Sequence, residues 1–447
     1  MALAICLFSD IMAAETINQP IFKGKKTMTW RFWAVLPAIF LLALPARADF
    51  QNLDRLLGEK DAVLILDPDG KTVFSKNAGS ELAPASTLKI LTCLFALSVM
   101  GEDFRFKTDF FIDRGKNLGI KGYGDPLLVS EELEKISNHL AGRLTGVRNL
   151  VMDDSYFAPG IQIPGVSPSF EPYDAPVGAL CVNFNSVYFA RGKDGRPKSA
   201  EPQTPLLPMA LERIEKYGRN SGRIVFSGKN RENLAHAGRL FHFFLNKAGI
   251  PSSGKVVMGR AGAGEDPPLH THLSTWSLKE VVQKTLEFSN NFMANQLLLT
   301  AGAQVSGPPA TLEKGVSALR AFARDRLGIT EIAIVEGSGI SRRNQISARN
   351  MAKILRAFRP HRRLMTRRGD EYYKTGSLKG IRARAGFFET PEGKLFSFCV
   401  MAHTGWKRMD AIMEGVRSKI KFSSSQSQST QSHPFEKPGA NGVCNRF

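Results

Sequence analysis

Three short motifs in this chain contain residue types that could together activate a serine. In the first, "PASTLKI", Ser86 and Lys89 lie three positions apart. A serine hydroxyl becomes a nucleophile when a base lies within hydrogen-bond reach, and residues i and i+3 of a helix share one face. Lys89 could therefore accept the Ser86 proton if burial or a neighbouring cation keeps it neutral. The same spacing occurs at Ser252/Lys255 and Ser418/Lys421, so the pair alone does not define a site.

The second motif is the only Lys-Thr-Gly of the chain, Lys374-Thr375-Gly376 in "YYKTGSLKG", a stretch typical of a strand. Its lysine and threonine could bind a substrate carboxylate, and Lys374 could be the cation beside Lys89. Gly376 would let a substrate backbone approach closely. The Ser377 N–H could join the Ser86 N–H, at the start of its helix, in an oxyanion hole.

The third motif, Ser289-x-Asn291 in "LEFSNNFMANQ", lies between the other two. The Ser289 hydroxyl could relay a proton to a leaving amine, and the Asn291 amide could hold the substrate peptide. A second Ser-x-Asn, Ser75/Asn77, precedes Ser86 and is out of order. The order Ser-x-x-Lys, Ser-x-Asn, Lys-Thr-Gly is typical of β-lactamases and penicillin-binding proteins.

With these motifs, the chain resembles the penicillin-binding proteins of the D-alanyl-D-alanine carboxypeptidase/endopeptidase family, which includes the class C low-molecular-mass type. Further segments resemble that family in its order, among them "KGYGDPLL", "APVGALCVNFNSV" and "EGSGISRRNQIS", over about residues 55–405. The long interval between Ser86 and Ser289 also fits, because this family inserts domains there. The resemblance implies an acylated nucleophile (Ser86), a base (Lys89), a relay and a positioner (Ser289, Asn291) and a carboxylate clamp (Lys374, Thr375).

The sequence departs from the family pattern at two places, and other functions stay open. The segment between Asn350 and Lys374 is short, and no clear aromatic-plus-acid stretch for a diamino acid occurs near "PSFEPYDAP". A serine β-lactamase would need a carboxylate poised over the ester; Glu287-x-x-Asn290 has such a spelling but overlaps Ser289. A catalytically weak peptidoglycan-binding protein is the third alternative.

The elements that must position these motifs predict an α+β fold. "AVLILD" (62–67) and "TVFS" (72–75) flank a Pro-Asp-Gly turn, a hairpin pattern, and a helical pattern follows up to Gly101. Near the C-terminus two further strands precede a helix over 409–420. We expect an antiparallel sheet with helices on its faces, and the resemblance implies a penicillin-binding/β-lactamase-like transpeptidase fold.

The predicted domain organisation has a catalytic domain in two parts, 49–112 and 265–422. Between them, 113–264 is expected to form a mainly β insertion that shapes substrate access, with a helix in "ENLAHAGRLFHFFLNKAGIP". Gly-rich 259–268 lacks G-x-G-x-x-G, which argues against nucleotide binding. The Ser/Gln-rich tail, 423–447, is expected to be disordered.

Residues 1–48 are expected to be a leader with a signal peptide: an apolar run from Phe32 to Leu44 precedes Ala46-Arg47-Ala48, an A-x-A cleavage site. The run is too short for a spanning helix. The location would then be periplasmic or otherwise extracytoplasmic.

Composition and charge indicate the partners. The chain of 447 residues carries a net charge of +19, which suits an anionic envelope polymer; the basic run 359–368 is expected to be a solvated face. We expect peptidoglycan and β-lactam antibiotics as partners, no nucleic acid and no cofactor. No spacing predicts a metal site, since His270 and His272 lack a third ligand. Cys93, Cys181 and Cys399 lie in apolar contexts typical of buried thiols.

Overall fold

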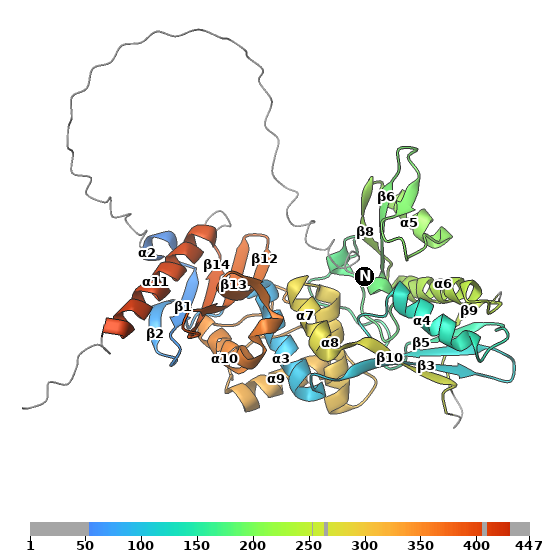
Figure 1. The fold of residues 1–447 in the computed structure, drawn as a ribbon, viewed down its shortest axis with the longest axis horizontal. Helices are drawn as coiled ribbons and strands as arrows, with labels where there is room; N and C mark the ends of the chain where they lie inside the picture. Colours follow the sequence, from blue (N-terminus) through green and yellow to red (C-terminus); the bar gives the residue numbers. More distant parts are fainter. Residues whose placement is uncertain (1–52, 253, 263–266, 405–408, 430–447) are drawn as a thin grey trace, which may run out of the picture.

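A six-stranded antiparallel sheet forms one end of the molecule (Figure 1). The computed structural model describes residues 53–252, 254–262, 267–404 and 409–429. The strand order is β11-β12-β13-β14-β1-β2. The strands are β1 (Ala62–Leu66), β2 (Thr72–Lys76), β11 (Thr366–Arg368), β12 (Glu371–Leu378), β13 (Ile381–Glu389) and β14 (Leu395–Ala402). Because β1 pairs with β14 along its whole length, segments from the N- and C-terminal parts of the described residues are joined in one sheet.

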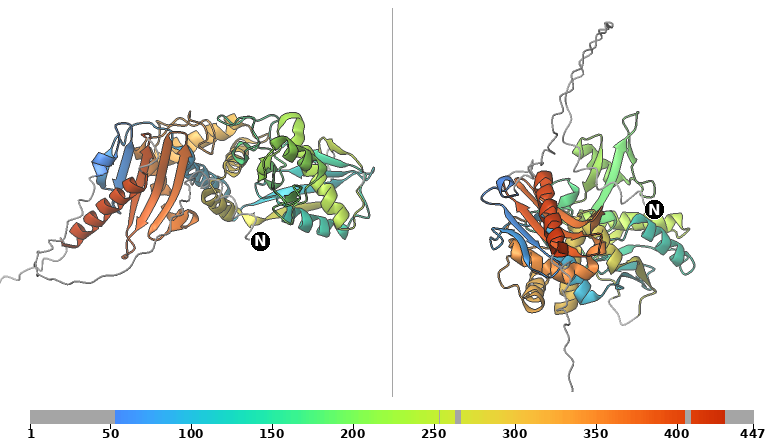
Figure 2. Two further views of the ribbon diagram at one scale, coloured as in Figure 1. Left: turned by 90° about the horizontal axis from the view of Figure 1, so that it is seen from above. Right: turned by 60° about the vertical axis from the view of Figure 1, so that its left-hand side comes forward.

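Both faces of this sheet are covered by helices, as Figures 1 and 2 show. On β1, Val63 and Ile65 contribute to the core under α2 (Leu53–Leu56) and α11 (Met409–Ser429). Ala62 and Leu64, which point to the opposite face because side chains alternate along a strand, belong to the main core. That core is built with α3 (Lys89–Met100), α7 (Leu278–Glu287), α8 (Asn291–Ser306), α9 (Leu312–Leu327) and α10 (Ala348–Phe358). The predicted α+β class, with helices on the faces of an antiparallel sheet, is confirmed.

The short segment ahead of the Lys-Thr-Gly motif is compact. Helix α10 passes directly into a 3-10 helix, η6 (Arg359–Leu364), and the hairpin β11–β12 follows. A 3-10 helix of six residues, about two turns, therefore links the helical layer directly to the β11–β12 hairpin.

The other end of the molecule consists of the inserted segment. Its main sheet has the order β10-β3-β4-β5-β9 and combines antiparallel pairs with parallel β4–β5 and β5–β9 pairs. A smaller sheet, β7-β6-β8, lies beside it. The strands are β3 (Arg105–Ile112), β4 (Leu118–Gly122), β5 (Leu150–Asp153), β6 (Ser186–Arg191), β7 (Pro197–Ser199), β8 (Ser221–Val225), β9 (Val256–Met258) and β10 (His270–Ser277).

This segment differs from the predicted mainly β insertion in two respects. It contains three helices, of which the sequence predicted only the last: α4 (Ser130–Ala141), α5 (Pro208–Tyr217) and α6 (Glu232–Lys247). Parallel strands need crossover connections, and helices provide them. Its sheet also begins before and ends after the predicted limits of 113–264, because β3 pairs with β10. Short 3-10 helices, η3 (Pro172–Asp174), η4 (Asn183–Asn185) and η5 (Lys229–Arg231), lie in its loops.

The tail predicted to be disordered, 423–447, is helical in its first part. Helix α11 continues through Ser429, so 423–429 are helical. Serine and glutamine are tolerated in a helix, and no proline or glycine interrupts the chain before Pro434. The leader with the predicted signal peptide, and 430–447, lie outside the described residues. No helix in the described ranges is long and apolar enough to cross a membrane.

Polar contacts at two places join the insertion to the rest of the chain. It enters and leaves at one place, where the Lys279 N–H donates to the Glu102 carbonyl at 3.0 Å. A second anchor is Gln296 of α8, whose side chain is fully buried. Its amide nitrogen donates to the Gly124 and Gly178 carbonyls at 3.2 and 2.9 Å, and its oxygen accepts the Gly178 N–H at 3.2 Å. These contacts lock α8, which carries Asn291, against the inserted segment.

Replacement of Gln296 should therefore destabilise the protein. Gln296→Ala removes the side-chain partner of the buried Gly124 carbonyl and of both backbone groups of the half-buried Gly178, so we expect the free energy of unfolding to fall by roughly 2 kcal/mol or more. The matched control is Gln304→Ala on the exposed side of the same helix, which should cost less than about 1 kcal/mol. Urea unfolding monitored by circular dichroism measures both. Equal effects of the two substitutions would contradict the anchoring role.

Candidate active site

The start of α3 presents Ser86. Residues Ala85–Leu88 form a 3-10 turn, η2, that leads directly into α3 at Lys89. The Thr87 hydroxyl donates to the Pro84 carbonyl at 2.7 Å and fixes this turn. Ala85 adopts a left-handed conformation with φ of 48°, which is uncommon for a residue with a side chain and marks a constrained position. Ser86 is half-buried, so its hydroxyl is reachable while the residues around it are not.

Lys89 joins three segments that are far apart in the sequence. Its Nζ donates to the Ser86 Oγ at 2.9 Å and to the Asn291 Oδ1 at 2.8 Å. It also donates to the Ser338 carbonyl at 2.7 Å. The side chain is fully buried, and this burial lowers the pKa of Lys89 to about 7. A neutral amine is thus accessible near neutral pH, as a general base requires.

Lys374 lies beside this group and contacts the third motif. Its Nζ donates to the Ser289 Oγ at 2.7 Å and to the Thr375 carbonyl at 3.0 Å. Burial, and then the charge of Lys89, lower the pKa of Lys374 well below its usual range. Ser289 has φ of 53°, and Asn290 caps α8 by accepting the Met293 N–H at 3.0 Å. The cap turns the chain so that Ser289 and Asn291 both face the lysines.

The edge of β12 closes the site from the sheet side. At Gly376 a Cβ atom would lie 2.9 Å from the backbone nitrogen of Ser86, so only glycine lets the strand approach the nucleophile turn this closely. Thr375 is exposed and Ser377 half-buried. Strand β11 pairs with β12 only as far as Tyr373, so the Lys-Thr-Gly stretch is an open edge to which a peptide could add. The structure therefore brings all eight predicted site residues to one place.

One residue of this site was missed from the sequence: Glu336, which is fully buried. Its carboxylate accepts hydrogen bonds from six donors of the loop that follows it and of α8. These are the N–H groups of Ser338, Gly339 and Ser341, the Ser338 hydroxyl and the amides of Asn295 and Asn344. The carboxylate thereby fixes the Ser338 carbonyl that Lys89 contacts, and its charge raises the pKa of Lys89, against the larger effect of burial.

The same loop supports the nucleophile turn. Gly339 has φ of 84°, and a Cβ atom there would lie 1.9 Å from the Ala85 carbonyl oxygen. The Thr92 hydroxyl donates to the Gly337 carbonyl at 2.6 Å. The sequence pattern that could have indicated Glu336 is a glutamate followed by Gly-Ser-Gly, because small residues there allow backbone contact with η2. The contacts of this loop with η2 and α8 join segments that are distant in the sequence.

The other candidate pairs have structural roles. The Ser252 hydroxyl contacts the His242 Nδ1, and the Ser418 hydroxyl donates to the Glu414 carbonyl within α11. The His272 Nε2 contacts Glu132 at 3.0 Å. In the described ranges no group of three or more His, Cys, Asp or Glu side chains could hold a metal ion. Cys93, Cys181 and Cys399 are free and buried.

With the site defined, comparison with known proteins identifies the family. The model of the D-Ala-D-Ala carboxypeptidase 3 (S13) family matches residues 48–215 and 223–367. The chain belongs to this family. The resemblance inferred from the motifs and the predicted class of enzyme, a serine D-Ala-D-Ala carboxypeptidase, are thereby confirmed.

Individual members of the family are similar over most of the chain. A D-alanyl-D-alanine carboxypeptidase of Actinomadura sp. is 26% identical over 465 residues, covering 83% of this chain and 86% of the relative. A D-alanyl-D-alanine carboxypeptidase of Haemophilus influenzae is 22% identical and covers 72% and 80%. The crystal structure of penicillin binding protein 4 from the same organism superposes with a TM-score of 0.68 at 18% identity, over 84% of this chain and 99% of that one. The transpeptidase fold is confirmed.

The pKa of Lys89 gives a test of Glu336. Acylation should slow as the pH falls below about 7, because Lys89 then becomes protonated. Glu336→Gln removes the charge that raises the pKa of Lys89, so the acidic limb of the acylation profile should move to lower pH. Stopped-flow measurement with a chromogenic β-lactam between pH 5 and 9 would record it.

The control for this experiment is Glu331→Gln, which removes an exposed carboxylate from the same region. Its profile should coincide with that of the unaltered protein. If Glu336→Gln lowered the rate equally at every pH, the carboxylate would have only a structural role.

Proposed function

We propose that this chain is a D-Ala-D-Ala carboxypeptidase and DD-endopeptidase that acts on peptidoglycan stem peptides or cross-links through an acyl-enzyme on Ser86. Membership in the family supplies the class of reaction. The 2.9 Å contact between the Lys89 Nζ and the Ser86 Oγ is the observation that carries the choice of nucleophile and base. The remaining residues receive their roles from their positions around this contact.

In the proposed acylation step, the Ser86 Oγ attacks the carbonyl carbon of the penultimate D-alanine while Lys89 takes the hydroxyl proton. The carbonyl oxygen becomes an oxyanion, which the N–H groups of Ser86 and Ser377 stabilise. The carbon–nitrogen bond then breaks. Ser289 donates its hydroxyl proton to the leaving amine and regains one from Lys89, whose amine is then neutral again. That amine belongs to D-alanine in a carboxypeptidase reaction and to a second stem peptide in an endopeptidase reaction.

Hydrolysis of the ester completes the cycle. Water attacks the acyl carbon, the carbon–oxygen bond to Ser86 breaks and the serine regains its proton. The Lys89 amine, held by Asn291 and by the Ser338 carbonyl, is the base positioned to accept the proton of that water. A β-lactam would follow the same path as far as the acyl-enzyme. One solved structure of the Haemophilus influenzae penicillin binding protein 4 carries a β-lactam in complex.

The substrate carboxylate is assigned to Lys374 and Thr375. An arriving carboxylate favours the protonated form of a buried lysine, so binding of substrate offsets the depressed pKa of Lys374. Thr375 is exposed at the open edge of β12, where its hydroxyl can donate to the same carboxylate. Asn291 would hold the peptide from the opposite side, next to the Tyr173 carbonyl at 3.4 Å from its Nδ2.

A β-lactamase reading has less support from the geometry. Rapid deacylation would need a carboxylate free to activate water. In the Glu287-x-x-Asn290 pattern, the Asn290 side chain is already used to cap α8. The buried Glu336 carboxylate is occupied by six protein donors. A slowly turned-over penicilloyl ester is therefore expected. We assign the protein to the cell envelope, where peptidoglycan lies, after removal of the leader predicted to end at Ala48.

Incubation with benzylpenicillin should give a single covalent penicilloyl adduct on Ser86. Lys89→Ala should slow its formation by roughly 100- to 10,000-fold, the usual contribution of a general base. Mass spectrometry of the intact protein, followed by peptide mapping, measures both. Lys255→Ala, beside the decoy Ser252, is the control and should leave the rate unchanged. An adduct on Ser252 or Ser418, or near-normal acylation of Lys89→Ala, would refute the assignment.

Lys374→Ala should weaken use of a D-Ala-D-Ala peptide. Removal of one partner from a buried charge pair costs about 2 kcal/mol or more, so kcat/KM should fall by about 30-fold or more. The matched control is Lys379→Ala, which removes an exposed lysine from the same hairpin. Release of D-alanine measures both variants. A variant of Lys374 that matched the control would place the carboxylate elsewhere.

A further inference from the structure

A cavity of about 350 Å³ lies outside the active site, between α10 and the β1–β2 hairpin. Strand β1, which lines the cavity, is separated from the Lys-Thr-Gly strand β12 by β13 and β14, and none of the eight candidate catalytic and substrate-binding residues is among the lining residues. Its volume falls in the range of small-molecule sites. Nothing in the proposed catalytic steps uses it.

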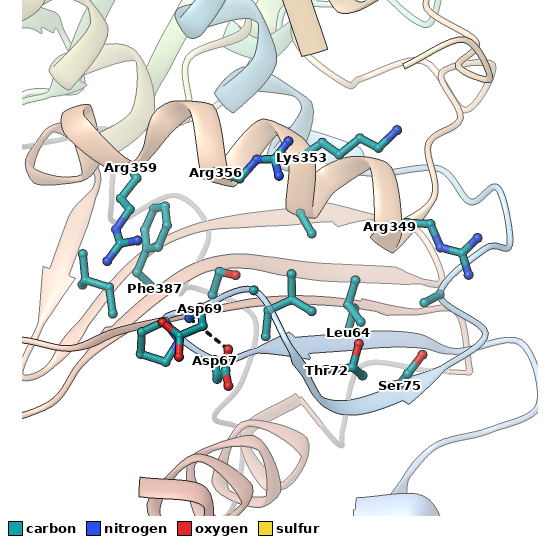
Figure 3. A pocket seen from close by; sticks show the side chains of 17 residues that line it. Leu64, Asp67, Asp69, Thr72, Ser75, Arg349, Lys353, Arg356, Arg359 and Phe387 are labelled. Atoms are coloured by element: carbon teal, nitrogen blue, oxygen red, sulfur yellow. Dashed lines mark hydrogen bonds between the residues drawn. The ribbon is translucent and has the colours of Figure 1, made fainter. Parts of the chain in front are cut away.

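Four cationic side chains line one wall of this cavity (Figure 3). Arg349, Lys353, Arg356 and Arg359 recur every three or four positions and therefore share one face of α10 and its extension. Like charges at this spacing destabilise a helix. The helix dipole favours Arg356 and Arg359 near the C-terminal end, but it opposes Arg349 in the first turn. The folded protein maintains this arrangement at a cost, which a bound anion would offset.

The arginines of this wall lack the carboxylate partners that others in the chain have. Arg362 and Arg384, for comparison, form ion pairs with Glu389 and Glu371 at 3.1 and 2.7 Å. Within the described residues, no ion pair involves Arg349, Arg356 or Arg359, and Lys353 only donates to the Gly328 carbonyl at 2.6 Å. Three guanidinium groups are thus available to a ligand.

The rest of the lining defines the ligand further. Asp67 and Asp69 lie across the cavity, and the Asp67 Oδ1 already accepts the N–H groups of Asp69 and Lys71. Four cations against two carboxylates leave a local excess of positive charge, which favours an anion with more than one negative charge. The floor is apolar, with Leu64, Ala352 and Phe387 among its residues, so it can also cover a carbon skeleton.

From this arrangement we propose that the groove between α10 and the β1–β2 hairpin is a second binding site, which takes a phosphate-bearing ligand of at least two negative charges. Guanidinium groups bind phosphate oxygens in pairs of parallel hydrogen bonds, and two arginines one or two helical turns apart can hold two phosphoryl groups. The site would hold the enzyme on a phosphate-bearing component of the envelope while the catalytic residues stay free for peptide.

Calorimetric titration of the full chain with inorganic pyrophosphate tests this proposal. The protein is first acylated with benzylpenicillin, so that the active-site lysines are covered. We expect saturable binding that weakens at least about tenfold in the double variant Arg349→Gln/Arg356→Gln, because each charge-assisted hydrogen bond is worth that much. Penicillin acylation should not change. Should this pair fail to fold by circular dichroism, Arg359→Gln alone serves instead.

The matched control is Arg320→Gln/Arg326→Gln, which removes the same charge from exposed positions of α9. It should bind pyrophosphate within about twofold of the unaltered protein. Co-sedimentation with vesicles of cardiolipin, whose headgroup carries two phosphodiester groups, compared with phosphatidylcholine vesicles, distinguishes a lipid headgroup from a soluble phosphate as the source. Absence of binding to both probes would overturn the proposal. Equal weakening in both double variants would overturn it as well, because binding would then depend only on the net charge of the protein.

Discussion

The active site depends on one buried amine. The Lys89 Nζ contacts Ser86 at the start of α3, Asn291 at the start of α8 and the Ser338 carbonyl in the loop before α10. Burial costs the charged form so much that the pKa of Lys89 falls to about 7. The same burial requires that each hydrogen bond of the amine be satisfied by the protein. The hydrogen bonds that the buried Lys89 amine requires therefore constrain the positions of three segments that are distant in the sequence.

The sheet and its two helical layers meet this constraint from both sides. Pairing of β1 with β14 joins the N- and C-terminal parts of the described residues in one sheet. Pairing with β13 holds β12 alongside η2, so that Gly376 contacts the turn that contains Ser86. From the helical side, Glu336 holds the loop that presents the Ser338 carbonyl. The negative charge of Glu336 raises the pKa of Lys89. Its hydrogen bonds hold the Ser338 carbonyl, which accepts a hydrogen bond from Lys89. The charge of Lys89 in turn helps to lower the pKa of Lys374, because neighbouring cations repel each other.

The three motifs could be located from the sequence because each is a local pattern whose members share a helix face or a strand, and the structure brings their residues together. Ser86 with Lys89, and Lys374 with Gly376, needed only spacing and residue type. Glu336 was missed because its role comes from donors brought together by folding, such as Asn295 from α8. Helices α4 and α5 were missed because Gly, Pro and Asn in the flanking loops suggested short strands. The predicted boundary at 113 falls directly after β3, whose pairing with β10 could not be read from the sequence because the whole inserted segment separates the two strands.

The inserted segment is more closely coupled to catalysis than its remote sheet suggests. Its residues Ala175 and Cys181 belong to the main core, together with Leu91 of α3 and Phe292 of α8. The Tyr173 carbonyl approaches Asn291, and Gly165 packs against the backbone of Ser341 in the loop organised by Glu336. Since α8 carries Asn291 on one side and the Gln296 anchor on the other, a shift of the insertion would move a residue that holds Lys89.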